Sequence, residues 1–213
     1  MSFLSYDDAR KSARRKLPRG LFDYIDRGVG EEASLKRLRV ALDEAEISPR
    51  ILSGLVDPDL RTELFGKQLS APFIIAPTAM AGLVHQGGEV ALAKAAQKYG
   101  IPFCLSTQSL SSVDEIAAAV PELDIWMQIY LWQDLAHSEK MLKRAWDAGV
   151  RVTVMADSGI RRGLDVLRYQ EKGAKAVMLG RLPIYALASE GMTGVIKALE
   201  ILGEELSEAL RYR

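Results

Sequence analysis

The most informative segments of this chain are Asp157-Ser158-Gly159-Ile160-Arg161-Arg162-Gly163 and Ala176-Val177-Met178-Leu179-Gly180-Arg181. Each predicts a short strand that runs into a glycine and an arginine at the start of a helix. They lie one βα unit apart, so their strands should be neighbours in a parallel sheet. Glycine permits close approach to the backbone, helix N-termini attract anions, and arginine offers a bidentate donor fork. One such turn alone would indicate only a solvated arginine, but the pair predicts a phosphate site.

Strands alternate with helices from about residue 70. Apolar runs predict strands at 73–77, 102–106, 124–131, 151–156 and 176–179, and helices at 87–99, 112–120, 134–148, 161–172, 183–189 and 195–210. This alternation is typical of βαβ units, so the fold class should be α/β with a parallel sheet. A closed eight-stranded barrel needs about 250 residues, so five units cannot close one. Either the sheet is open or the chain lacks part of a barrel.

An N-terminal helical segment at 1–65 should precede the main domain at 66–213. We expect Asp7 or Asp8 to cap a first helix that ends by Pro18, and a second short helix to be closed by Gly28 and Gly30. A third helix should follow at about 32–42, with extended pieces at 47–52 and 62–64.

Composition excludes several classes of function. Lys and Arg total 28, and so do Asp and Glu, so no net charge favours nucleic acid or a membrane surface. No apolar run approaches the roughly 20 residues of a membrane-spanning helix. The lone cysteine, Cys104, permits no internal disulfide and favours a reducing, cytoplasmic setting. We expect no bound metal.

On its motifs the chain resembles the FMN-dependent 2-hydroxy acid dehydrogenase/oxidase family, which includes glycolate oxidase, lactate oxidase and mandelate dehydrogenase. One matching block ends near Val154 and includes Phe22-Asp23-Tyr24, Ala76-Pro77-Thr78-Ala79-Met80, Leu105-Ser106-Thr107 and Gln128-Ile129-Tyr130. The second block runs from there to Arg213 and holds the two segments quoted above. The resemblance implies a TIM-barrel-derived fold with about five of eight βα units, FMN as cofactor, and oxidation of a small 2-hydroxy acid to a 2-oxo acid.

Between these blocks the family has more chain. Val150–Val154 resembles the family's strand four and runs directly into Met155-Ala156-Asp157, which resembles strand seven. The family's His-Gly-Gly-Arg motif after strand six, which supplies the catalytic base and the carboxylate-binding arginine, is absent. So is the strand-five lysine that contacts the flavin. No catalytic residue is therefore retained at the family base position.

The chain has two histidines, neither at that position. His85 follows the first strand, and we interpret it as a loop residue near the mouth of the site. His137 lies in a predicted helix and should be exposed.

The resemblance carries site residues over by position. It implies flavin contacts at the ends of the first four strands and a ribityl-hydroxyl acceptor at Asp157, followed by a phosphate cradle. Tyr24 and Tyr130 match substrate-side tyrosines, although packing with a wet hydroxyl is the simpler interpretation of each. The implied cofactor-binding residues are Pro77, Thr78, Ala79, Ser106, Gln128, Thr153, Asp157, Ser158, Gly159, Ile160, Arg161, Gly180 and Arg181.

Three functions remain open at this point. The first is an FMN-dependent oxidoreductase whose turnover is weak or absent in this chain. The second is a non-catalytic flavin- or phosphate-binding remnant of that fold, and the third is a different barrel enzyme acting on a sugar phosphate. Thr78, Gln128 and Tyr130 together favour flavin over the third. Because five strands cannot close a barrel, their unpaired edges should seek partners, and we expect a homo-oligomer.

Overall fold

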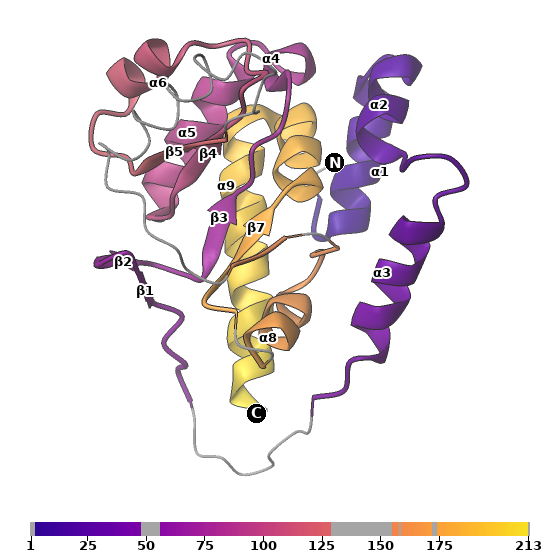
Figure 1. Cartoon of the computed structure of the whole chain (residues 1–213), viewed down its shortest axis with the longest axis vertical. Helices are drawn as coiled ribbons and strands as arrows, with labels where there is room; N and C mark the ends of the chain where they lie inside the picture. Colours follow the sequence, from indigo (N-terminus) through magenta and orange to yellow (C-terminus); the bar gives the residue numbers. More distant parts are fainter. Residues whose placement is uncertain (1–2, 48–55, 129–154, 158, 172–173, 213) are drawn as a thin grey trace, which may run out of the picture.

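The computed structural model describes residues 3–47, 56–128, 155–157, 159–171 and 174–212 (Figure 1). Five parallel strands form the main sheet in the order β5-β4-β3-β7-β6. Their bounds are β3 Phe73–Ile75, β4 Phe103–Leu105, β5 Ile125–Met127, β6 Met155–Asp157 and β7 Ala176–Leu179. Asp157 of β6 is in register with Met178 of β7, which confirms that the two predicted phosphate segments follow neighbouring strands.

The order of the strands is that of an arc of a barrel. The first strand of the main sheet, β3, pairs with the last, β7, in the register Phe73↔Val177, Ile74↔Met178 and Ile75↔Leu179. In a closed parallel barrel the last strand likewise pairs with the first. The described sheet ends at β5 on one side and at β6 on the other. The expectation of an incomplete parallel barrel is therefore confirmed for the described residues.

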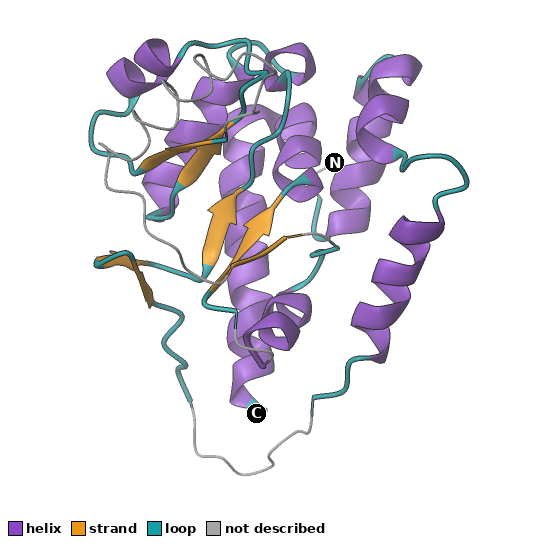
Figure 2. Cartoon of the chain, in the orientation of Figure 1, coloured by secondary structure: helices purple, strands orange, loops and turns teal. Residues whose placement is uncertain are grey.

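Both faces of this sheet are covered. Successive side chains of a strand point to opposite faces, and on β3 the two sets of side chains belong to different hydrophobic clusters. Phe73 and Ile75 belong to the larger core, which includes residues of α5 (Gly88–Tyr99), α8 (Gly163–Glu171) and α9 (Arg181–Arg211). Ile74 belongs to a smaller cluster that the antiparallel hairpin of β1 (Thr62–Leu64) and β2 (Lys67–Leu69) joins. Figure 2 shows the helices crowded behind and beside the strands, and the hairpin near the start of β3.

Three helices precede the sheet and stand along one side of it in Figure 1: α1 (Tyr6–Lys16), α2 (Arg19–Asp26) and α3 (Ala33–Glu44). The predicted cap of α1 is wrong. Ser5 is the cap, and its hydroxyl accepts a hydrogen bond from the Asp8 backbone N–H at 3.2 Å. Asp7 and Asp8 instead lie in the first turn, where their charge complements the helix dipole.

The two helices expected at the C-terminus together form α9, and the non-helical backbone at Glu190 and Gly191 (φ +62°) separates them, which agrees with the expectation. Other differences concern short elements. Helix α4 (Ala81–Val84) and strand β2 were not predicted, whereas α6 (Val113–Ala119) was. The helix expected at 134–148 lies outside the described residues.

Candidate functional site at the carboxyl ends of the strands

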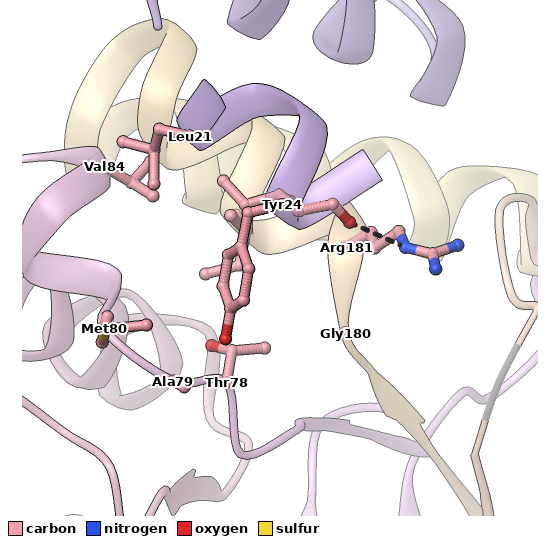
Figure 3. A pocket seen from close by; sticks show the side chains of 10 residues that line it. Leu21, Tyr24, Thr78, Ala79, Met80, Val84, Gly180 and Arg181 are labelled. Carbon is pink, nitrogen blue, oxygen red and sulfur yellow. Dashed lines mark hydrogen bonds between the residues drawn. The ribbon is translucent and has the colours of Figure 1, made fainter. Parts of the chain in front are cut away.

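A cavity of about 210 Å³ lies where the carboxyl ends of β3 and β7 meet α2 (Figure 3). Ligands in parallel α/β proteins usually bind at this edge. Three elements build it: α2, the segment after β3 together with α4, and the start of α9. Its lining is Leu21, Tyr24, Ile25, Thr78, Ala79, Met80, Val84, Gly180, Arg181 and Ile184.

One polar atom in this cavity lacks a partner. The Thr78 Oγ1 is buried and makes no hydrogen bond within the described structure. The Tyr24 ring extends from α2 toward Thr78 (Figure 3), and Tyr24 is 59% exposed, so a solute can reach it. A buried hydroxyl without a partner is costly and uncommon, which makes Thr78 a candidate contact for a polar ligand.

The start of α9 leaves room for a ligand. Gly180 is the N-cap residue and provides no side-chain cap, and a Cβ added there would meet nothing within 4 Å. Arg181 donates from Nε to the Ile25 carbonyl oxygen at 3.1 Å, which ties α9 to α2. The rest of its guanidinium extends away from Tyr24 and Thr78 (Figure 3). Gly180 and Arg181 thus lie at a helix N-terminus, a position where anions bind in many proteins.

The other predicted phosphate segment is arranged differently. At the start of α8, the Asp165 Oδ2 accepts from the backbone N–H of Arg161 at 2.9 Å and of Arg162 at 3.2 Å. The Arg161 guanidinium lies 5.1 Å from the centre of the Tyr6 ring and lines a different, very small cavity. The structure thus brings the two strand ends together but places the side chains of Arg161 and Arg181 in different surroundings.

Ser106 and Gln128 end β4 and β5, and the structure joins them. The Ser106 hydroxyl is buried, donates to Gln128 Oε1 at 3.2 Å, and accepts from the Gln108 backbone N–H at 3.1 Å. The Gln128 N–H donates to the Leu105 carbonyl at 2.8 Å. Both lie at the carboxyl edge of the sheet but do not line the cavity, and neither does the half-buried Pro77.

The remaining predicted residues are dispersed. Asp157 is exposed at the end of β6, and Ile160 is buried. His85 is exposed, its Nδ1 lies 2.8 Å from the Gln86 carbonyl oxygen, and its Nε2 faces Gly191 of α9, where an added Cβ would lie 2.8 Å away. Tyr130, His137, Thr153 and Ser158 lie outside the described residues.

A partly buried ionic cluster that the sequence analysis missed ties α2 to α1 and α9. Asp26 accepts two hydrogen bonds from the Arg10 guanidinium, at 2.5 and 2.6 Å, and one from the Tyr185 hydroxyl at 2.7 Å. Burial alone would raise the pKa of Asp26, but the hydrogen bonds from Arg10 and Tyr185 outweigh it and lower that pKa. The three residues come from α1, α2 and α9, so no local sequence pattern could have joined them.

The fold and the cavity define a class of protein: a barrel-derived α/β chain with a candidate anion and polar-ligand site at the carboxyl ends of its strands. The sequence profile of the FMN-dependent dehydrogenase family matches residues 13–154 and 149–212. The chain therefore belongs to that family, whose cofactor is FMN, as the resemblance implied. The two matches meet at 149–154, where the sequence analysis placed the junction between its blocks.

Curated relatives and solved structures agree with this assignment. The chain is 41% identical to an L-lactate dehydrogenase of Xanthobacter autotrophicus over 154 residues, which are 72% of this chain and 39% of that protein. It is 41% identical to one of Vibrio parahaemolyticus over 147 residues, 69% of this chain and 38% of that protein. The match thus spans about two fifths of the length of these relatives.

A mandelate oxidase structure with 3,3-difluoro-2-hydroxy-3-phenylpropionic acid is 26% identical, with a TM-score of 0.89 over 98% of this chain and 94% of the other. A structure of (S)-mandelate dehydrogenase, 22% identical with a TM-score of 0.87, shows the same fold over 99% of this chain and 95% of the other.

The described residues fit part of an FMN molecule. Thr78 offers a buried hydroxyl without a partner, Gly180 leaves open space at a helix N-terminus, and Arg181 supplies a guanidinium beside it. The cavity, at about 210 Å³, is smaller than the ~300–1,000 Å³ typical of ligand pockets.

Proposed function

We propose that this chain binds FMN and serves the oxidation of a small 2-hydroxy acid to a 2-oxo acid, with weak or no turnover as the chain stands. The observation that carries the proposal is the meeting of Thr78, Gly180 and Arg181 at one cavity on the carboxyl edge of the sheet. Thr78 follows β3 and the other two follow β7, which are neighbouring strands. Membership of the FMN-dependent dehydrogenase family supports the choice of ligand.

Each contact residue would have a distinct role. Arg181 and the start of α9 would hold the phosphate, because a guanidinium and free backbone amides together favour a doubly charged anion. Thr78, Ser106 and Gln128 would offer hydroxyl and amide groups to the flavin ring. Tyr24 would bind the substrate carboxylate through its hydroxyl, as would Tyr130, which lies outside the described residues. The roles of Pro77, Ala79, Thr153, Asp157, Ser158, Gly159, Ile160 and Arg161 remain those that the family resemblance implies.

The expectation of weak turnover follows from proton transfer. FMN, when bound, accepts the electron pair that leaves the substrate carbon, and a base must take the hydroxyl proton. General acid–base catalysis contributes about 10²–10⁴-fold. Of the two histidines in the chain, His85 faces the bend of α9 and does not line the cavity. Among the described residues, the cavity lining contains no carboxylate or imidazole.

That lack of a base favours a second candidate function, a non-catalytic module that binds FMN or a phosphate ligand. The two candidates share the cofactor and differ in turnover. Anaerobic mixing of the FMN-loaded chain with L-lactate, glycolate or mandelate separates them. Bleaching of the flavin absorbance within seconds would support catalysis, and an unchanged spectrum would support the module.

FMN binding itself is tested by titrating the purified apo chain with FMN and following quenching of flavin fluorescence. Thr78→Val is a sharp variant, because it removes a buried hydroxyl that has no partner in the fold. We expect the melting temperature to stay the same or rise, and FMN affinity to fall. A parent chain that failed to bind FMN at micromolar concentrations would contradict the proposal.

Two further properties are proposed. We expect a homo-oligomer, because the described sheet ends at β5 and β6 and Met127 of β5 is 44% exposed. We expect a cytoplasmic setting, supported by the lone cysteine. Within the described residues, no helix is long and apolar enough to cross a membrane.

A further inference from the structure

We infer that Arg39, on α3 of the N-terminal segment, is a positioning residue that sets the shape of the Gly159–Arg162 segment and thereby the affinity for the phosphate of the cofactor. The inference rests on the proposed FMN function and adds a residue that does not line the cavity. Arg39 lies more than 100 residues before the segment it contacts.

Hydrogen bonds occupy every N–H donor of the Arg39 guanidinium. Its Nη1 donates to the Gly159 carbonyl oxygen at 2.9 Å and to Asp165 Oδ2 at 2.9 Å, and its Nη2 donates to Asp165 Oδ1 at 2.8 Å. Its Nε and Nη2 also donate to the two carboxylate oxygens of Asp43, at 3.0 and 2.7 Å. A guanidinium has five N–H donors and an ammonium has three, so lysine cannot reproduce this set.

Asp165 relays the contact to the backbone. Its side chain is fully buried, and the oxygen that faces Arg39 Nη1 also accepts from the backbone N–H groups of Arg161 and Arg162. The next amide, of Gly163, donates to Glu205 Oε2 at 2.7 Å. Burial alone would raise the pKa of Asp165, but the hydrogen bonds from Arg39 and the Arg161 backbone N–H lower it. Protein carboxylates thus fix the direction of this backbone.

A steric contact from α3 acts at the same place. Gly159 has φ +75°, a conformation that favours glycine, and an added Cβ would lie 2.6 Å from Leu42 Cδ1 and 3.2 Å from Leu38 Cδ2. Helix α3 therefore packs against the segment while Arg39 binds its carbonyl group. The segment follows β6, and Gly180 and Arg181 follow the neighbouring strand β7. Under the proposed function the segment would therefore border the phosphate, and a change in its conformation would be felt there.

The test compares FMN with riboflavin, which lacks the phosphate, for the full chain and three variants. Arg39→Ala should reduce the ratio of FMN affinity to riboflavin affinity by about tenfold, the loss expected for one displaced charge-assisted hydrogen bond. Arg39→Lys should recover melting temperature but little of that ratio. Arg37→Ala is the matched control, because Arg37 is an exposed residue of the same helix. Its ratio should equal that of the parent.

Hydrogen exchange of the Arg161 and Arg162 amides in the apo chain gives a second readout. Arg39→Ala should speed their exchange, whereas Arg37→Ala should not. Equal loss of FMN and riboflavin affinity in Arg39→Ala, or unchanged amide exchange, would overturn the inference. A parent that bound neither flavin would contradict the proposed function, and the amide exchange alone would then decide whether Arg39 positions the segment.

Discussion

Replacement of Arg181 by alanine tests the phosphate site most directly. Arg181 lines the cavity beside Gly180 and is tied by Nε to the Ile25 carbonyl. Under the proposed function, its loss would remove a charge-assisted contact to the phosphate, which is worth about 1.5–3 kcal/mol. FMN should therefore bind about 10- to 150-fold more weakly to Arg181→Ala than to the parent.

The same substitution carries a smaller structural cost that must be separated from the loss of affinity. The lost bond to Ile25 is worth about 1 kcal/mol, which lowers the melting temperature of a chain of this size by about 2–4 °C. Riboflavin separates the two effects, because a displaced α2 would weaken both flavins whereas a lost phosphate contact weakens FMN alone. Arg19→Ala is the control, since the Arg19 side chain is 93% exposed and pairs only loosely with Asp23, at 3.8 Å.

The assay is fluorescence titration of each apo protein with FMN and with riboflavin at fixed ionic strength, after far-UV spectra have shown that the variants are folded. Equal FMN affinity in the parent and Arg181→Ala would refute the assignment of the phosphate to the start of α9. A parallel fall for both flavins would assign Arg181 to packing of α2 instead.

Three further outcomes are expected. Gly180→Ala should leave the melting temperature nearly unchanged yet weaken FMN binding. Gly159→Ala should instead destabilise the apo chain, because residue 159 has a positive φ and the added Cβ would clash with Leu42. Equal melting temperatures for the two variants would contradict this expectation. The pKa of Asp26 is lowered in the folded chain. Its contribution to stability is therefore complete above the unfolded-state pKa of about 3.9 and is lost as the pH falls through the folded-state pKa. Asp26→Asn should accordingly flatten the acid side of a plot of melting temperature against pH. Light scattering coupled to size exclusion should show an oligomer, and a sharp monomer peak near 23.5 kDa would exclude one.

The sequence predicted the regular parts of the fold well. The apolar run at 176–179 is strand β7 with the same bounds, and the parallel pairing of β6 with β7 follows from βαβ alternation. Short elements such as α4 and β2 were missed, and the start of α1 was misplaced because Ser5 competes with Asp7 and Asp8 as a cap. Serine and aspartate are comparable caps, so the sequence alone could not choose between them.

The candidate site was predictable only in part. Gly180 and Arg181 could be found because they follow an apolar strand at the start of a helix, and Thr78 could be found because its segment resembles a family motif. Contacts between distant helices could not, and these include the Arg10–Asp26–Tyr185 cluster and the pairing of Arg39 with Asp165. The sequence pattern predicts that the backbone amides at the start of α8 bind a phosphate, but Asp165 of α8 accepts hydrogen bonds from two of them. No spacing rule distinguishes these two uses of a helix start.

The pairing of β3 with β7 has a consequence for how the chain is made. The paired residues Phe73 and Val177 are separated by about 100 positions, so this contact closes a long loop and forms slowly. At about 5–20 residues per second, a ribosome needs roughly 5–20 s to synthesise that stretch. During that interval β7 has not yet been synthesised, so the apolar side chains of β3 lack their partner strand. A chaperone that binds nascent strands would act during this time.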